Sequence, residues 1–95
     1  MNRAEVDRSQ RFVTFSHLPH FALLRIFDLA GELVKTIRKE GDSQFVRWDL
    51  NNETGLPVAG GLYIAHLELS DAAGRSLGEK TLKLMIVREE QSLGN

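Results

Sequence analysis

Cysteine is absent from the 95-residue chain. Its absence excludes disulfide bonds, thiolate metal sites and cysteine nucleophiles together. Long apolar runs are also lacking, since none approaches the roughly 20 residues that a membrane-spanning helix needs. Residues 1–11 carry charges throughout and contain no apolar core of a signal peptide. We therefore expect no membrane insertion, and we expect any export signal to lie upstream or in the folded domain itself.

An excess of charge of one sign is missing as well. Twelve basic residues stand against thirteen acidic ones, which gives a net charge of −1. The two signs are interspersed, so no basic stripe marks a nucleic-acid surface or an anionic membrane surface. A chain of this length is enough for one domain with a single core. We expect one globular domain that does not bind nucleic acid.

Recognisable catalytic motifs are absent too. The sequence has no G-x-S-x-G nucleophile motif, no P-loop and no G-x-G-x-x-G between a strand and a helix. Its carboxylates are scattered over turns and polar strand faces, without a pair that suggests acid–base catalysis. His17, His20 and His66 could hold zinc only if the fold brought them together, and solvated or capping roles are favoured. We expect no enzymatic activity, no metal and no cofactor.

The sequence does contain short apolar runs separated by turn residues. β-branched, aromatic and aliphatic side chains gather in these runs, as is typical of strands. The runs occupy residues 12–15, 22–28, 32–38, 45–50, 62–70 and 80–88. Six or seven strands at intervals of roughly 8–12 residues predict an all-β sandwich or barrel over residues 11–88. Residues 1–10 are predicted to be a polar lead-in or linker, and residues 89–95 a polar tail.

Alternation along three of these runs predicts which side chains form the core. The inward-facing residues are Val46, Trp48, Leu50, Tyr63, Ala65, Leu67, Leu69, Leu82, Leu84 and Ile86. We expect them to meet in one dry interior between two β layers. The opposite face of the last run mixes Thr81 and Lys83 with Met85 and Val87, which would allow its second half to be covered on both sides.

One segment, residues 27–39, also fits a helix. Its aliphatic residues follow an i, i+4, i+5, i+8 stripe formed by Leu29, Leu33, Val34 and Ile37. Gly31 in the middle costs about 1 kcal/mol relative to alanine, and the β-branched residues after it also disfavour a helix. We therefore favour two strands with a turn at Gly31.

The stretch WDLNNETGLPVAGGLY, residues 48–63, gathers polar and aromatic residues that could form a site. Asp49, Asn51 and Glu53 have the spacing of calcium ligands, but the loop lacks the sixth-position glycine and the distal bidentate glutamate. Trp48 and Tyr63 could form a platform for a sugar, although their place in the strand pattern favours the core. We favour a purely structural interpretation of the stretch.

Glycine explains the rest of this stretch. Gly55 suits the left-handed position that closes a turn, and Gly60-Gly61 allows a tight bend into the next strand. Pro57 lacks an N–H, so its neighbourhood is expected to be a connector or an edge.

Four segments taken together resemble a known family. They are residues 24–34 (LRIFDLAGELV), 46–49 (VRWD), 55–63 (GLPVAGGLY) and 80–88 (KTLKLMIVR). In this pattern the chain is similar to the immunoglobulin-like module of the flagellar hook-cap protein and its relatives. Those relatives include the C-terminal sorting domains of proteins exported by the type IX secretion system of Bacteroidetes-type bacteria.

The resemblance implies an all-β fold, an immunoglobulin-like antiparallel β-sandwich of six to seven strands. It also implies structural roles for the motif residues Gly31, Trp48, Asp49, Gly55, Gly61 and Tyr63. The chain departs from the family in two places. Leu50 stands where many members have glycine, and residues 89–95 extend beyond the last strand, where sorting domains tend to stop.

The resemblance further implies a non-catalytic C-terminal module of a larger secreted or cell-surface bacterial protein. Its partner would be the secretion or surface-assembly machinery, and it would be covalently continuous with a passenger chain. We place the candidate recognition surface at Lys80, Lys83 and Arg88, because a charged edge strand can accept a partner strand selectively. The same lysines could instead keep the edge from aggregating. Two alternative functions are a spacer or assembly domain of a surface or flagellar protein, and a carbohydrate-binding accessory domain.

Overall fold

The computed structural model describes residues 3–6 by their backbone and residues 12–88 in full. The described residues form seven strands and no helix. The strands are β1 (Arg3–Val6), β2 (Val13–Ser16), β3 (Phe21–Asp28), β4 (Leu33–Glu40), β5 (Val46–Trp48), β6 (Gly61–Ser70) and β7 (Ser76–Ile86). The helix considered for residues 27–39 is therefore ruled out, because this segment forms the end of β3, a turn and most of β4.

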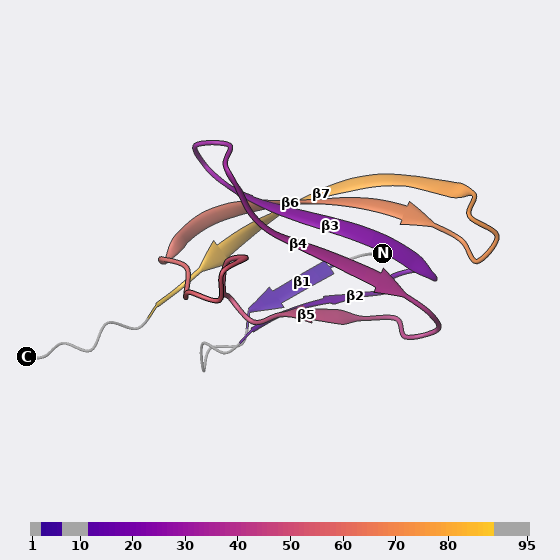
Figure 1. The fold of residues 1–95 in the computed structure, drawn as a ribbon, viewed down its shortest axis with the longest axis horizontal. Coiled ribbons are helices and arrows are strands. Elements are labelled where there is room, and N and C mark those ends of the chain that lie inside the picture. The colour runs from indigo at the N-terminus through magenta and orange to yellow at the C-terminus, as the bar shows by residue number, and fades with distance from the viewer. Residues whose placement is uncertain (1–2, 7–11, 89–95) are drawn as a thin grey trace, which may run out of the picture.

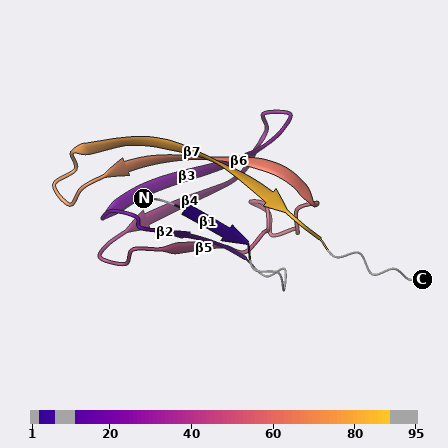
Figure 2. The ribbon, with the colours of Figure 1, turned by 180° about the vertical axis from the view of Figure 1, so that it is seen from behind.

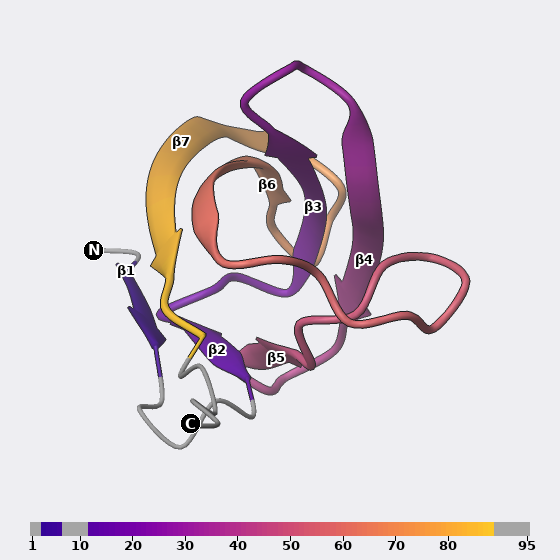
Figure 3. The ribbon, with the colours of Figure 1, turned by 90° about the vertical axis from the view of Figure 1, so that its left-hand side faces the viewer.

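Two antiparallel sheets pack face to face (Figures 1 and 2). One sheet has the strand order β1-β2-β5, and the other has the order β4-β3-β6-β7. Figure 3 looks along the layers and shows the three-stranded sheet lying beneath the four-stranded sheet. The fold is an immunoglobulin-like β-sandwich. It confirms the all-β fold predicted from the strand pattern and the sandwich that the family resemblance implied.

The core occupies the space between the sheets. The most buried side chains are Val13, Phe15, Leu24, Ile26, Trp48, Leu50, Ala65, Leu67, Leu84 and Ile86, each at most 2% exposed. Tyr63 and Leu69 are each 6% exposed, while Val46 and Leu82 are half-buried against this cluster. The predicted inward face is thus confirmed along β5, β6 and β7, because alternate side chains of a strand point to the same face.

The second half of β7 differs from expectation. Met85 is 53% exposed and Val87 is 47% exposed, so this part of the chain is covered on one side only. The three-stranded sheet packs on the inner face, and no described element lies over the outer face. The apolar residues there are exposed to solvent.

The strand boundaries differ most from the sequence prediction at β1 and β7. β1 lies within the predicted lead-in of residues 1–10 and pairs with β2 from Arg3 opposite Ser16 to Val6 opposite Val13. β7 begins at Ser76, four residues before the predicted start at Lys80, and pairs with β6 across a bulge at Leu69/Ser70. Both segments are short or poor in apolar residues, so no period-2 pattern marked them. The predicted tail at residues 89–95 lies outside the described residues, as do residues 1–2 and 7–11.

Three tight turns share one sequence pattern, Asp or Asn followed three positions later by Gly. In each turn the first side-chain oxygen accepts hydrogen bonds from the backbone N–H groups two and four positions later. The glycine N–H donates to the first residue's carbonyl oxygen, and the glycine adopts φ of 86–88°. The turns are Asp28–Glu32, Asn52–Leu56 and Asp71–Arg75. This local chemistry explains why Gly31 and Gly55 occupy their motif positions, since only glycine takes positive φ without strain.

Candidate recognition surface

The Trp48–Tyr63 stretch closes one end of the core. The Trp48 Nε1–H donates to the Asn51 carbonyl oxygen at 2.9 Å. The Trp48 and Tyr63 rings meet edge to face with centroids 5.9 Å apart. The Tyr63 hydroxyl donates to the Ala59 carbonyl oxygen at 2.6 Å, a contact that resembles the tyrosine corner of immunoglobulin-like sandwiches. Both rings are buried, so they cannot form the sugar-binding platform considered from the sequence.

Burial also changes the acid–base chemistry of Tyr63. Its pKa is raised above 10.0, first by burial of the hydroxyl and then by the nearby Asp28 carboxylate, while Arg88 lowers it. The hydroxyl therefore stays protonated at neutral pH and remains a hydrogen-bond donor to the loop.

The possible calcium ligands face different partners. The Asp49 carboxylate accepts from the Asn51 backbone N–H at 3.1 Å. The Glu53 carboxylate instead accepts from the Thr36 N–H on β4 at 2.7 Å. Each carboxylate thus fixes a neighbouring backbone segment, and the pair does not converge on a common cation position. Within this loop, Asp49 caps the backbone N–H of Asn51.

Leu50 occupies a backbone conformation that glycine adopts without strain. Its φ is 65°, in the left-handed region, and its side chain is only 1% exposed. For a residue with a β-carbon this conformation costs about 1–2 kcal/mol. Burial of the leucine side chain in the core offsets this strain.

Arg88 lies against the same loop. Its Nε donates to the Val58 carbonyl oxygen at 3.0 Å, and its Nη2 donates to the Leu50 carbonyl oxygen at 3.3 Å. A β-carbon on Gly60 would lie 3.2 Å from the Ile86 carbonyl oxygen and 3.4 Å from the Arg88 backbone nitrogen. The loop therefore passes close to the end of β7, and Arg88 binds it there instead of presenting a free charge to a partner.

Lys80 and Lys83 do not share a face. Lys80 pairs with Leu67 and thus has the inward parity of β7, whereas Lys83 pairs with Ile64 on the outer face. Both side chains are exposed. The single surface predicted from Lys80, Lys83 and Arg88 therefore does not form. The odd spacing of the two lysines already indicated that they lie on different faces, since positions three apart on a strand point to opposite faces.

A hollow of about 510 Å³ lies next to Lys80. Its lining includes Leu18 and Pro19 from the loop before β3, and Leu69 and Leu77 from β6 and β7. Leu77 is 56% exposed. β7 is the last strand of its sheet, and β1 lies beside its C-terminal part (Figure 3). The N-terminal half of β7 thus combines a strand edge, an exposed leucine, a cationic side chain and a hollow lined by both apolar and polar side chains.

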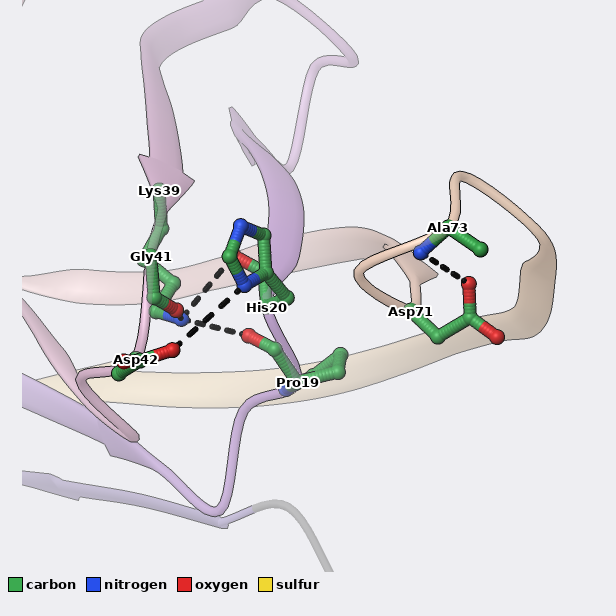
Figure 4. A network of polar contacts seen from close by, with 7 residues as sticks. All are labelled: Pro19, His20, Lys39, Gly41, Asp42, Asp71 and Ala73. Carbon is green, nitrogen blue, oxygen red and sulfur yellow. Dashed lines mark hydrogen bonds and ion pairs between the residues drawn. The ribbon is translucent and has the colours of Figure 1, made fainter.

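The opposite end of the core from Trp48 is closed by a residue that sequence reasoning missed. Lys39 is 7% exposed and points inward from β4. Its ammonium donates to the carbonyl oxygens of Pro19 at 2.6 Å, His20 at 3.1 Å and Gly41 at 2.6 Å (Figure 4). A lysine in a strand normally indicates solvent, so only its inward parity opposite Ala22 could have signalled this role.

The three histidines do not form the zinc site considered from the sequence. His20 stacks edge to face on Phe21 and lies 3.8 Å from the Asp42 carboxylate. His66 lies in β6, where its nearest potential metal-ligating neighbours are Glu68 and Glu79. Within the described part of the chain, no other group of His, Cys, Asp or Glu has metal-binding spacing. The same residues include no helix long and apolar enough to span a membrane.

Solved structures with this fold include two from Porphyromonas gingivalis. PorZ, described as an essential bacterial surface component of the type IX secretion system, matches with a TM-score of 0.67 and 20% identity. PorU, described as dimeric and latent, matches with a TM-score of 0.63 and 16% identity. The matches cover 92% and 93% of this chain but only 11% and 9% of PorZ and PorU, so the chain spans about a tenth of their length. Comparisons of the sequence with family models and with curated proteins give no match. At these identities, the likeness concerns the fold alone.

Proposed function

We propose that the chain is a non-catalytic module of a larger secreted or cell-surface bacterial protein, and that the type IX export machinery recognises it as a sorting domain. The observation that carries the proposal is the fold shared with a small part of PorZ, a surface component of that system. The four motif segments support it independently. In each solved neighbour the matching part is about a tenth of a long chain, which suits a module attached to a passenger.

Recognition takes place at the N-terminal half of β7. The edge of residues Ser76–Lys80 offers backbone N–H and C=O groups to an extended segment of the partner. The hollow beside Leu77 and Lys80 accepts an apolar side chain of that segment. Lys80 then pairs with an acidic group of the partner, which adds selectivity more than affinity.

This mechanism separates the two lysines of β7. Lys80 lies at the hollow, while Lys83 lies on the outer face of the same strand. Lys83→Glu is therefore a matched control for Lys80→Glu, because it introduces the same charge change three residues away. Arg88 is unsuitable for this test, since its guanidinium holds the loop at Leu50 and Val58.

The test is an export assay of a passenger protein fused to the module in a bacterium with a type IX system. We expect the wild-type fusion to reach the cell surface or medium, and a strain without the system to retain it. Lys80→Glu should reduce export several-fold, and Lys83→Glu should leave it near the wild-type level. Circular dichroism of each purified variant checks that the sandwich is folded.

Two outcomes would contradict parts of this proposal. Retention of the wild-type fusion in the cell would reject the sorting role and favour a spacer or assembly domain. Normal export of Lys80→Glu would reject the β7 edge as the recognition surface, and would leave the lysine as a guard against edge-to-edge aggregation.

A further inference from the structure

The outer face of the four-stranded sheet carries a cluster of one histidine and two carboxylates. His66 Nε2 lies 3.3 Å from Glu79 Oε1 and 4.0 Å from Glu68 Oε2. All three potential ligand atoms lie within 4.8 Å of one another. His66 and Glu68 are neighbours on the same face of β6, and Glu79 comes from β7. A paired sheet thus positions all three backbones.

The two carboxylates create a local need for positive charge. Glu68 and Glu79 stand directly opposite each other on paired strands. Like charges in this arrangement destabilise a sheet. Arg25 on β3 compensates one of them, because its Nη1 lies 2.9 Å from Glu68 Oε2. Among the residues that the structure describes, Glu79 has only the His66 imidazole as a cationic partner, and this ring carries a positive charge only when protonated.

We propose that His66, Glu68 and Glu79 bind a divalent transition-metal ion of the zinc class. Ligand bonds of about 2.0–2.2 Å in a tetrahedral site place ligand atoms roughly 3.3–3.5 Å apart. The His66–Glu79 separation already has this value, whereas Glu68 Oε2 lies 4.0 Å from His66 Nε2, so the half-buried Glu68 side chain would have to rotate slightly to complete the site. Three protein ligands leave the fourth position to water or to a carboxylate of a partner.

Arg25 fits this site as a supporting residue. Carboxylates that bind metals are themselves commonly hydrogen-bonded, and such contacts fix their orientation. From the neighbouring strand β3, Arg25 Nη1 donates to Glu68 Oε2, the oxygen that also lies 4.0 Å from His66 Nε2. The whole site would therefore connect three adjacent strands on the outer face, away from the hollow at Lys80.

The ligand set also selects the metal. Imidazole nitrogen suits zinc, copper and nickel, whereas magnesium and calcium prefer oxygen ligands in larger numbers. Three ligands that include a nitrogen should discriminate strongly against magnesium. The inference does not depend on the proposed export role, because metal binding is measured on the purified module.

The test is isothermal titration of the tag-free protein with Zn²⁺, and with Mg²⁺ as the comparison ion. We expect one equivalent of zinc to bind, and His66→Gln and Glu79→Gln each to weaken binding by at least about tenfold. His20→Gln and Glu40→Gln are matched controls, because they remove an imidazole and an exposed carboxylate outside the cluster. Their affinities should equal that of the wild type.

Histidine NMR signals provide the second measurement. Zinc should shift the ring signals of His66 first, and those of His17 and His20 should stay unchanged until the site is full. Absence of zinc binding, or equal affinity of His66→Gln and wild type, would overturn the proposal and leave the cluster as an ion-pair network. Equal affinities for zinc and magnesium would also overturn it, since a nitrogen ligand would then make no contribution.

Discussion

The two ends of the sandwich core are closed by the same type of contact, made by different side chains. At the Trp48 end, defined by Trp48, Tyr63 and Arg88, an indole, a phenol and a guanidinium donate to loop carbonyl oxygens. At the Lys39 end, a single buried ammonium donates to three carbonyl oxygens. Irregular loops leave carbonyl groups without strand partners, and long side chains from the strands satisfy them.

The difference lies in how each end is stabilised. The Trp48 end combines hydrogen bonds with a large apolar contact, because Trp48 is fully buried and packs on Tyr63. The Lys39 end depends on one charge whose desolvation is compensated, within the described residues, by three hydrogen bonds. We therefore expect mutations to be costlier at the Trp48 end, and loss of the donor to be the dominant effect at the Lys39 end.

The largest effect is expected from Trp48→Ala. Removal of a fully buried indole leaves a cavity and should lower the free energy of unfolding by about 3–5 kcal/mol. That is a large share of a typical total of about 5–15 kcal/mol. Urea denaturation followed by circular dichroism measures the change. Phe45→Ala is the control, because Phe45 is 54% exposed and its loss should change little.

Lys39→Met should have the next largest effect. Methionine preserves the packed stem but leaves the carbonyl groups of Pro19 and Gly41 without their donor, at a cost of about 1–3 kcal/mol. Lys83→Met removes the same ammonium from an exposed position. If both variants unfold at the same urea concentration, Lys39 does not close its end of the core.

Arg88→Ala should lower stability by about 1.5–3 kcal/mol, because two hydrogen bonds from a charged donor are lost. Arg88→Lys should lie between wild type and alanine, since an ammonium cannot reach both carbonyl oxygens in the manner of the planar guanidinium. Thermal unfolding of the wild type, Arg88→Lys and Arg88→Ala ranks the three proteins by stability. An alanine variant as stable as the wild type would mean that Arg88 is free for partner binding after all.

Changes of pH are expected to have the smallest effects on stability. Alkaline pH should weaken the Trp48 end, and acid pH should weaken the Lys39 end. Burial raises the pKa of Tyr63 above 10.0. The contribution of Tyr63 to the free energy of unfolding is therefore complete below pH 10.0 and is lost as the pH rises further. Near the Lys39 end, the pKa of Asp71 is lowered below 3.8, chiefly by the hydrogen bond from the Arg75 backbone N–H (the Asp71 turn appears in Figure 4). Its contribution is complete above pH 3.8 and is lost as the pH falls through the lowered pKa.

Melting temperatures across the pH range check both directions. Tyr63→Phe should reduce the fall in melting temperature at alkaline pH and leave the fall at acid pH unchanged. Asp71→Asn should reduce the fall in melting temperature at acid pH and leave the fall at alkaline pH unchanged. The interpretation would be contradicted if either variant altered the pH dependence on the side of the profile that is assigned to the other residue.

The burial of Trp48 and Tyr63 was predictable from sequence, whereas the roles of Arg88 and Lys39 were not. Strict alternation along residues 62–70 determined the inward face of β6, and the position of Trp48 followed from the same rule. Lys39 was missed because its partners are carbonyl groups of two loops, whose positions depend on the packing of β3 and β4. β1 was missed because its four residues are too few for a period-2 pattern.

Recognition residues were the least predictable part. The basic residues of the last strand were grouped by a motif, although strand parity separates Lys80 from Lys83. The structural role of Arg88 depends on a loop thirty or more residues earlier in the chain, which no local pattern encodes. The cluster at His66 likewise depends on the register between β6 and β7, which the bulge at Leu69/Ser70 shifts.

The central claim is that the folded sandwich itself, and not a linear stretch of its sequence, is the export signal. The most direct measurement compares export of one passenger fused to the wild-type module or to the double variant Phe15→Ala/Trp48→Ala, which loses two fully buried aromatic side chains. Both fusions keep every charged residue, circular dichroism of the purified modules establishes that the double variant is unfolded, and immunoblots of whole cells ensure equal amounts of intact protein. We predict that the double-variant fusion stays inside the cell while the wild-type fusion is exported. Equal export of the folded and unfolded modules would contradict the account.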